Sequence, residues 1–266
     1  MTCNSLIALL LACFLATIPE NAAAKAVGTV TSIDPGADLT HLQQSAKLVA
    51  GAVVSSGDVI ITDRNGQVQL LFNDETRVAI GPNSRFVIDD VVLKSSGAAK
   101  RFAVSAIAGS FRFITGKSKK SVYSINTPTA TMGIRGTVFD FVVRQRLGTD
   151  LVIFSGEVRM CGNGGNCFKV TGQCAAVQMD TDGNFSTVEK KADKRDLIAH
   201  GFLFVSGQQQ LQPEFRTTVR SCGRDVIGQV IEKKGNDKAP QQNPTPEPPK
   251  PPDPPPDPPD PPPHPI

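Results

Sequence analysis

The chain has 266 residues, a formal net charge of +3 at neutral pH and 6% aromatic residues. A charge this close to zero argues against a nucleic-acid-binding protein, which needs a strongly basic surface. Its histidines, His41, His200 and His264, lie far apart in the sequence. This spacing argues against a histidine-based metal centre.

The first 24 residues have the pattern of a cleaved signal peptide. An apolar run from Leu6 to Ile18 is followed by three alanines that end at Ala24. This small-residue site predicts cleavage after Ala24, and the run is shorter than the roughly 20 apolar residues of a membrane-spanning helix. A lipoprotein cleavage box that ends at Cys13 is the alternative. We therefore expect a periplasmic or secreted mature chain without a membrane span.

Residues 25–190 are expected to form an all-β domain. Short runs rich in Val, Ile, Thr and Phe alternate here with turn-forming Gly, Asn and Asp. This rhythm is typical of a single antiparallel β-sandwich or β-roll of jelly-roll-like type. The expected strands are Val27–Ile33, Asp58–Thr62, Gln67–Asn73, Arg77–Ile80, Arg85–Leu93, Arg101–Ile107, Ser110–Thr115, Val122–Asn126, Thr137–Arg144, Leu151–Phe154, Glu157–Cys161, Cys167–Thr171, Ala175–Met179 and Phe185–Val188.

Five basic residues gather in the middle of this domain, namely Arg101, Arg112, Lys117, Lys119 and Lys120. Alternation along strands predicts that they lie on the solvated side of a sheet. Weak contact with a polyanion or lipopolysaccharide is the alternative.

Four cysteines remain after the predicted cleavage: Cys161, Cys167, Cys174 and Cys222. An even number in an oxidising compartment predicts disulfides, and four cysteines permit three connectivities. The turn-prone insert between Cys161 and Cys167 favours pairing these two, which leaves Cys174 with Cys222. Zinc is the competing use, but the sequence contains no Cys-x-x-Cys motif.

The C-terminal part changes character twice. Residues 191–234 predict a helical or irregular extension, with Asp193 as N-cap and an apolar stripe that includes Leu197, Ile198 and Phe202. Residues 235–266 form a proline-rich segment that we expect to be disordered. An extended polyproline tail of this kind serves as a spacer or as a docking strip for a partner.

Motifs for catalysis or cofactor binding are incomplete. Gly116-Lys117-Ser118 resembles the end of a phosphate-binding loop, but Phe111 stands where the first glycine is needed. The acidic pairs Asp74/Glu75 and Asp89/Asp90 lie beside expected turns or strand ends, where acidic residues are common. We therefore predict no enzyme, no cofactor and no metal.

One segment resembles a known family. Thr127-Pro128, the core Gly133-Ile-Arg135-Gly136-Thr137 and the closing Phe139 are similar to the signature of FecR-type domains, and the resemblance extends over about residues 52–177. It implies a periplasmic interaction module. The cytoplasmic segment and membrane helix of FecR regulators are missing, which argues against direct transmembrane regulation.

The two glycines beside Arg135 predict a tight crossing of backbone segments. We expect Arg135 to form a buried ion pair with Asp58, Asp74 or Asp140. Binding of an anionic ligand by Arg135 is the alternative.

These observations together predict an exported, non-enzymatic binding or scaffolding protein of the bacterial envelope. Its expected partner is another envelope protein, with the proline-rich tail as an added docking or spacer element. The alternative is a sensory accessory protein that passes an extracellular signal to a separate membrane receptor or cyclase. A hydrolase of envelope polymers would need two carboxylates converging in a cleft.

Overall fold

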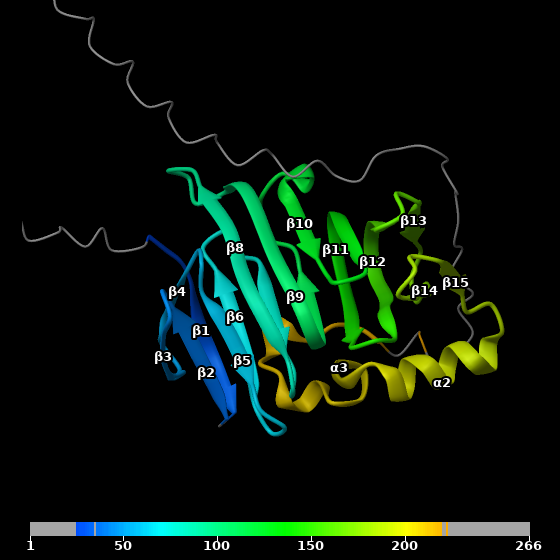
Figure 1. Cartoon of the computed structure of the whole chain (residues 1–266), viewed down its shortest axis with the longest axis horizontal. Helices are drawn as coiled ribbons and strands as arrows, with labels where there is room; N and C mark the ends of the chain where they lie inside the picture. Colours follow the sequence, from blue (N-terminus) through cyan, green and yellow to red (C-terminus); the bar gives the residue numbers. More distant parts are fainter. Residues whose placement is uncertain (1–24, 35, 220–221, 223–266) are drawn as a thin grey trace, which may run out of the picture.

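Fifteen strands of the computed structural model join into one continuous sheet within the described residues, which are 25–34, 36–219 and 222 (Figure 1). The strands are β1 (Ala26–Asp34), β2 (Ala37–His41), β3 (Gln44–Lys47), β4 (Val53–Ser55), β5 (Val59–Thr62), β6 (Gln67–Phe72), β7 (Arg77–Ile80), β8 (Arg85–Leu93), β9 (Ala99–Ile114), β10 (Tyr123–Asn126), β11 (Ala130–Arg144), β12 (Gly148–Gly162), β13 (Cys167–Thr171), β14 (Ala176–Met179) and β15 (Phe185–Thr187). The all-β prediction is confirmed. All pairings are antiparallel except that of β9 with β10, which is parallel, so the sheet is mixed.

The sheet folds over on itself because the long strands β9, β11 and β12 change partners along their length. The first half of β9 pairs with β8 and β10, and its second half pairs with β7 and β11. β12 pairs with β14 near its start and with β13 near its end. Two layers result. The open layer contains β2, β3, β5, β8, β10 and β13, and the covered layer contains β1, β4, β6, β7, β14 and β15.

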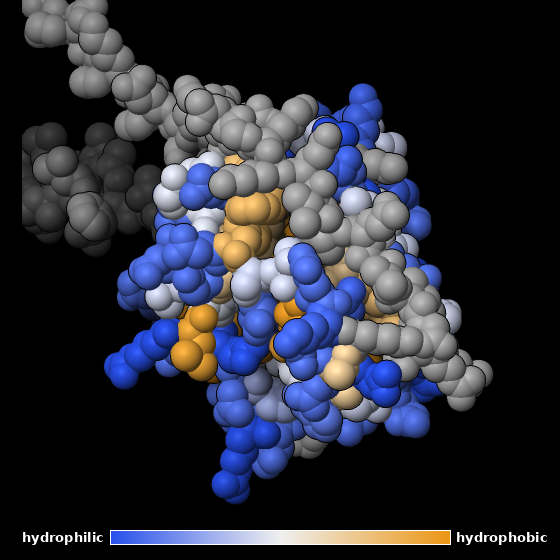
Figure 2. All heavy atoms as spheres, turned by 90° about the vertical axis from the view of Figure 1, so that its right-hand side faces the viewer, coloured by the Kyte–Doolittle hydropathy of each residue, from blue (hydrophilic) through white to orange (hydrophobic). Residues whose placement is uncertain are grey.

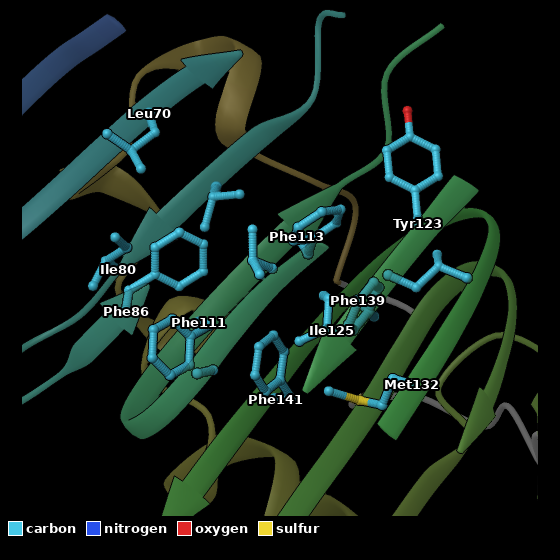
Figure 3. Close-up of a cluster of buried hydrophobic side chains, with 14 of the residues drawn as sticks. Leu70, Ile80, Phe86, Phe111, Phe113, Tyr123, Ile125, Met132, Phe139 and Phe141 are labelled. Atoms are coloured by element: carbon cyan, nitrogen blue, oxygen red, sulfur yellow. The ribbon is translucent and has the colours of Figure 1, made fainter. Parts of the chain in front are cut away.

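Aromatic side chains from both layers meet in the core (Figure 3). Phe72 in β6 lies 4.8 Å, between ring centroids, from Phe102 in the first half of β9. Phe86 in β8 lies 5.8 Å from Phe111 in the second half of β9. All four side chains are buried, and burying each one stabilises the fold by roughly 1.5–3 kcal/mol. These contacts fasten one layer to the other.

Each long strand turns the corner between the layers at a glycine with positive φ: Gly109 in β9, Gly136 in β11 and Gly156 in β12. Core-facing residues on either side of each corner are an odd number of positions apart, as Ile134 and Phe139 show. Because side chains alternate with a period of two, an odd spacing requires one extra residue in the strand. The glycine corners therefore keep the apolar face inward on both layers.

Strands β2, β3 and β4 were not predicted from the sequence. Together they span residues 37–55, where polar and small residues are common, and every residue of β3 is exposed. β3 has no buried face and therefore no hydrophobic alternation to detect, and β2 and β4 are only 5 and 3 residues long.

The C-terminal extension contains the helices α2 (Lys191–Gly201) and α3 (Leu203–Ser206) and the 3₁₀ turns η2 (Gln208–Gln210) and η3 (Pro213–Phe215). A further 3₁₀ turn, η1 (Lys120–Val122), precedes β10. The prediction of Asp193 as N-cap is wrong, because Lys190 occupies that position and Asp193 lies in the first turn. A carboxylate there still interacts favourably with the helix dipole.

The predicted signal peptide (1–24) and proline-rich tail (235–266) lie outside the described residues. Within the part of the chain that the structure describes, no helix is long and apolar enough to cross a membrane. The end of the molecule that carries α2, β13 and β15 shows mainly hydrophilic side chains, with small apolar areas between them (Figure 2).

Candidate functional site

The FecR-like motif builds the corner between β11 and β12. Thr137 is buried, and its hydroxyl donates to the backbone oxygen of Glu157 at 2.9 Å and accepts from the backbone N–H of the same residue at 3.3 Å. Phe139 is fully buried and stacks on Phe113, with 5.6 Å between ring centroids. Both side chains therefore support the fold rather than a ligand.

The start of the motif closes the turn between β10 and β11. The hydroxyl of Thr127 accepts from the backbone N–H of Ala130 at 3.0 Å, and the carbonyl of Pro128 accepts from Asn163 at 2.9 Å. Gly133 pairs with Arg159 in the ladder between β11 and β12 and is partly exposed. These positions fix the turn that precedes the corner.

Arg135 is exposed, so the prediction of a buried ion pair at this position is wrong. All three candidate carboxylates have other partners: Asp58 contacts His41, Asp74 accepts from Tyr123, and Asp140 pairs with Arg112. Within the described residues the side chain of Arg135 makes no hydrogen bond or ion pair. The corner turns its side chain outward, which leaves the guanidinium available to a partner.

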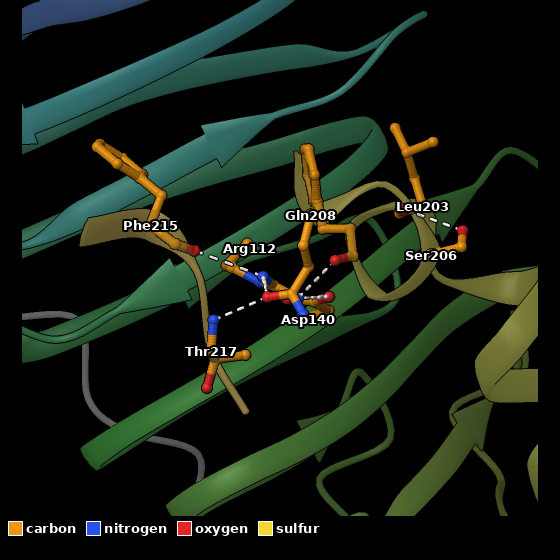
Figure 4. Close-up of polar contacts among 8 residues, drawn as sticks. Arg112, Asp140, Leu203, Ser206, Gln208, Phe215 and Thr217 are labelled. Atoms are coloured by element: carbon orange, nitrogen blue, oxygen red, sulfur yellow. Dashed lines mark hydrogen bonds and ion pairs between the residues drawn. The ribbon is translucent and has the colours of Figure 1, made fainter. Parts of the chain in front are cut away.

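The buried arginine of this fold is Arg112, which was expected on a solvated face and is 0% exposed. Its Nε donates to Oδ1 of Asp140 at 2.7 Å, and its Nη2 donates to Oδ2 at 2.8 Å (Figure 4). Its remaining N–H groups donate to Gln208 Oε1 at 2.9 Å and to the carbonyls of Phe204 at 2.9 Å and Phe215 at 3.4 Å. Every donor of the guanidinium thus has an acceptor.

A C-terminal strap, residues 203–217, supplies three of these acceptors. It crosses the outer side of the covered layer along one row of paired residues: Gln69, Ala79, Arg112 and Asp140. Gln69 accepts from the backbone N–H of Gln212 at 2.8 Å. Ala79 packs with Phe204, Leu211 and Phe215 of the strap. The strap explains why this face of the sheet is buried.

Burial raises the pKa of Asp140, and the charge and hydrogen bonds of Arg112 counteract that increase. The pair is bidentate and sealed from solvent. Neither group can exchange a proton with a substrate in this position, because solvent and ligands cannot reach it. The arrangement anchors the strap and is unsuited to acid–base catalysis.

A second buried network surrounds Asp74, which is fully buried. Its Oδ2 accepts from the hydroxyls of Tyr123 and Ser118, each at 2.8 Å, and its Oδ1 accepts from the backbone N–H of Thr76 at 3.0 Å. Desolvation raises the pKa of Tyr123, so this hydroxyl stays protonated and donates. The network joins the turn after β6 to the segment between β9 and β10.

Disulfides join Cys161 to Cys167 and Cys174 to Cys222, the two pairs expected from the sequence. The first fastens the edge strand β13 to β12. The second attaches the segment after the strap to the turn before β14. Cys174 belongs to an apolar cluster with Phe154, Ile198 and Phe202, so this disulfide and α2 cover the same region.

Replacing Cys161 and Cys167 by serine is expected to lower the free energy of unfolding by about 2 kcal/mol. The pair closes a short loop, with a sequence separation of 6, and the entropic stabilisation grows with loop length. Urea denaturation of the variant and of the native chain, both oxidised, measures the difference. A loss above about 4 kcal/mol would contradict the short-loop argument.

The described residues contain no group of three or more His, Cys, Asp or Glu side chains that could hold a metal ion.

Residues 58–159 match the family model described as "FecR protein". No curated protein matches the chain.

Several solved structures show weak similarity. A "Cell surface anchoring domain" is 28% identical over 23% of this chain and 83% of its own, with a TM-score of 0.23. Two crystal structures of a candidate anti-sigma factor from Parabacteroides distasonis ATCC 8503 are 12% identical, with TM-scores of 0.41 and 0.39. Each of these two covers 49% of this chain, which spans 58% of that protein's length. All three TM-scores are below 0.5, so these similarities establish neither fold nor function.

The residues that match the family model form the central part of the folded sheet. The matched residues run from the start of β5 through the corner of β12, and they include both the glycine corner and the Arg112–Asp140 pair. The strap lies beyond the matched range. Residues 58–159 of this chain are therefore similar to the FecR family.

Proposed function

We propose that this chain is an exported, non-enzymatic binding or scaffolding protein of the bacterial envelope. The similarity of residues 58–159 to the FecR family is the observation that carries the proposal. The structure adds support from chemistry, because the buried charged groups Arg112, Asp140 and Asp74 are all engaged in contacts that hold the fold together. A protein with this architecture offers rigid surfaces to a partner.

Export predicts a defined N-terminus. Mass spectrometry of the mature protein from the periplasm or culture medium is expected to find a chain that begins at Lys25. Replacing Ala24 by arginine should block processing, and replacing Cys13 by serine should leave it unchanged. A lipidated N-terminus at Cys13 would contradict cleavage after Ala24.

Crosslinking in intact cells, followed by identification of the trapped molecule, tests the binding function. We expect one envelope protein to be enriched over an unrelated exported protein of similar size. Recovery of a membrane receptor or cyclase would favour the alternative role as a sensory accessory protein. Recovery of glycan without protein would contradict the proposal.

A further inference from the structure

The two outer sides of the folded sheet differ in what covers them. The strap and α2 pack on the covered layer. Outward-facing residues of the open layer remain partly exposed along β9, β10 and β11, as Ala103, Ser124 and Gly133 show. These three residues are paired neighbours across the sheet. Among the described residues no other element covers this surface of the open layer, which we call the open face.

The middle of the open face is flat because its side chains are small. Beside the row of Ala103, Ser124 and Gly133 runs a second row, in which Ser105, Asn126 and Thr131 are paired neighbours. Their polar groups are partly engaged with each other, since the Thr131 hydroxyl donates to Asn126 at 3.3 Å. Small side chains let another protein surface approach the sheet closely.

One end of the open face is cationic. The row through Gly133 continues to Arg159 in β12 and Lys169 in β13, and Arg135 lies two residues further along β11. Glu157, the acidic residue paired opposite Arg135 in the ladder, accepts an ion pair from Lys169 at 2.7 Å. Arg135, Arg159 and Lys169 are therefore neighbours at this end, and the side chain of Arg135 makes no ion pair with any described residue.

This end is also held rigidly. The Cys161–Cys167 disulfide joins β12 to β13 next to Arg159 and Lys169, and the glycine corner fixes the backbone beside Arg135. Because this backbone is already ordered, binding a partner there costs side-chain freedom but no loop ordering.

We propose that the open face is the docking surface for the partner, and that this partner is a protein with an acidic patch that contacts Arg135, Arg159 and Lys169. The inference rests on the proposed binding function and specifies its site. Charge complementarity carries it, because an arginine fork binds carboxylates in a bidentate manner. The two central rows of the open face contain no aromatic side chain, so they lack the stacking platform that bases use.

Photo-crosslinking in intact cells tests this assignment. A photoreactive residue at Ser124 probes the open face, and one at Gln209, an exposed residue of the strap, probes the other side. We expect a protein adduct from position 124 and none from position 209. The trapped protein should have a net negative surface, and its yield should fall when ionic strength is raised.

Arg135→Glu is expected to reduce the adduct from position 124 about tenfold, because attraction becomes repulsion at the cationic end. Arg146→Glu makes the same charge change at an exposed position in the turn between β11 and β12 and should leave the yield unchanged. Secretion level and melting temperature should match the native chain in both variants, since both side chains are exposed.

The outcomes separate the two proposals. Adducts from position 209 alone would overturn the open face as the docking site and leave the binding function standing. Adducts that persist in Arg135→Glu, or lipopolysaccharide in place of a protein, would overturn the acidic-protein partner. Absence of adducts from both positions, together with no trapped protein from chemical crosslinking, would overturn the binding function itself.

Discussion

Arg112→Met is expected to lower the free energy of unfolding by about 3–5 kcal/mol, the usual cost of removing one partner from a buried ion pair. The change leaves the Asp140 carboxylate without its bidentate partner. It also leaves the carbonyls of Phe204 and Phe215 in the strap without that donor. Equilibrium urea unfolding of the full mature chain measures the loss.

Two variants control this experiment. Arg135→Met is the same substitution in the same domain at an exposed, unpaired arginine, and it should change stability by less than about 0.5 kcal/mol. Arg112→Met combined with Asp140→Leu removes both charges and should recover most of the loss, because apolar replacement of a buried pair is often neutral.

The same variants test the role of the strap. If the Arg112–Asp140 pair anchors residues 203–217, Arg112→Met should increase the hydrogen-exchange rate of backbone amides in the strap more than that of amides in β9 and β11. An equal change in exchange rate throughout the domain would show that the pair stabilises the sheet without anchoring the strap in particular.

The all-β class could be predicted from the sequence because buried strands carry a hydrophobic alternation. The corners were visible only as interruptions: β9 and β12 were each predicted as two strands, broken near Gly109 and Gly156, where each continuous strand crosses between layers. A shift in the hydrophobic alternation occurs at a bulge within one strand and also at a turn between two strands. The sequence pattern does not distinguish a bulge from a turn, because both interrupt the alternation.

The buried ion pair left a signal that residue spacing could have revealed. Arg112 stands between Phe111 and Phe113, and Asp140 stands between Phe139 and Phe141. A charged residue flanked by core phenylalanines must face the other side of its strand. Two such residues of opposite charge predict a covered outer face with a salt bridge. Which strands pair, and what covers them, depends on contacts over about 100 residues of sequence that local patterns do not encode.

Arg135 shows the opposite error. The close backbone approach expected beside Arg135 is present at Gly136, since a Cβ at Gly156 would lie 2.1 Å from its carbonyl oxygen. The arginine was expected in a buried ion pair because a guanidinium laid against the sheet at such a crossing needs an anionic partner. Its side chain points outward because Ile134 and Met132, one and three residues before it, face the core.

Gly156→Ala is expected to destabilise the domain by about 3–4 kcal/mol. About 1 kcal/mol comes from placing a Cβ at positive φ, and the remainder from overpacking against backbone that cannot move aside. The added Cβ would lie 2.1 Å from the carbonyl oxygen of Gly136 and 2.8 Å from Cα of Thr137. Urea unfolding, or failure to accumulate in the soluble exported fraction, measures the effect.

Gly165→Ala is the matched control for this corner. Gly165 has φ of 81°, close to the 85° of Gly156, but a Cβ there meets nothing within 4 Å. Gly165→Ala should lower the free energy of unfolding only by the cost of positive φ, about 1 kcal/mol. Similar losses in both variants would mean that positive φ alone governs the corner. A loss clearly larger in Gly156→Ala than in Gly165→Ala would show that glycine is needed at position 156 so that β11 and β12 can cross between layers in contact.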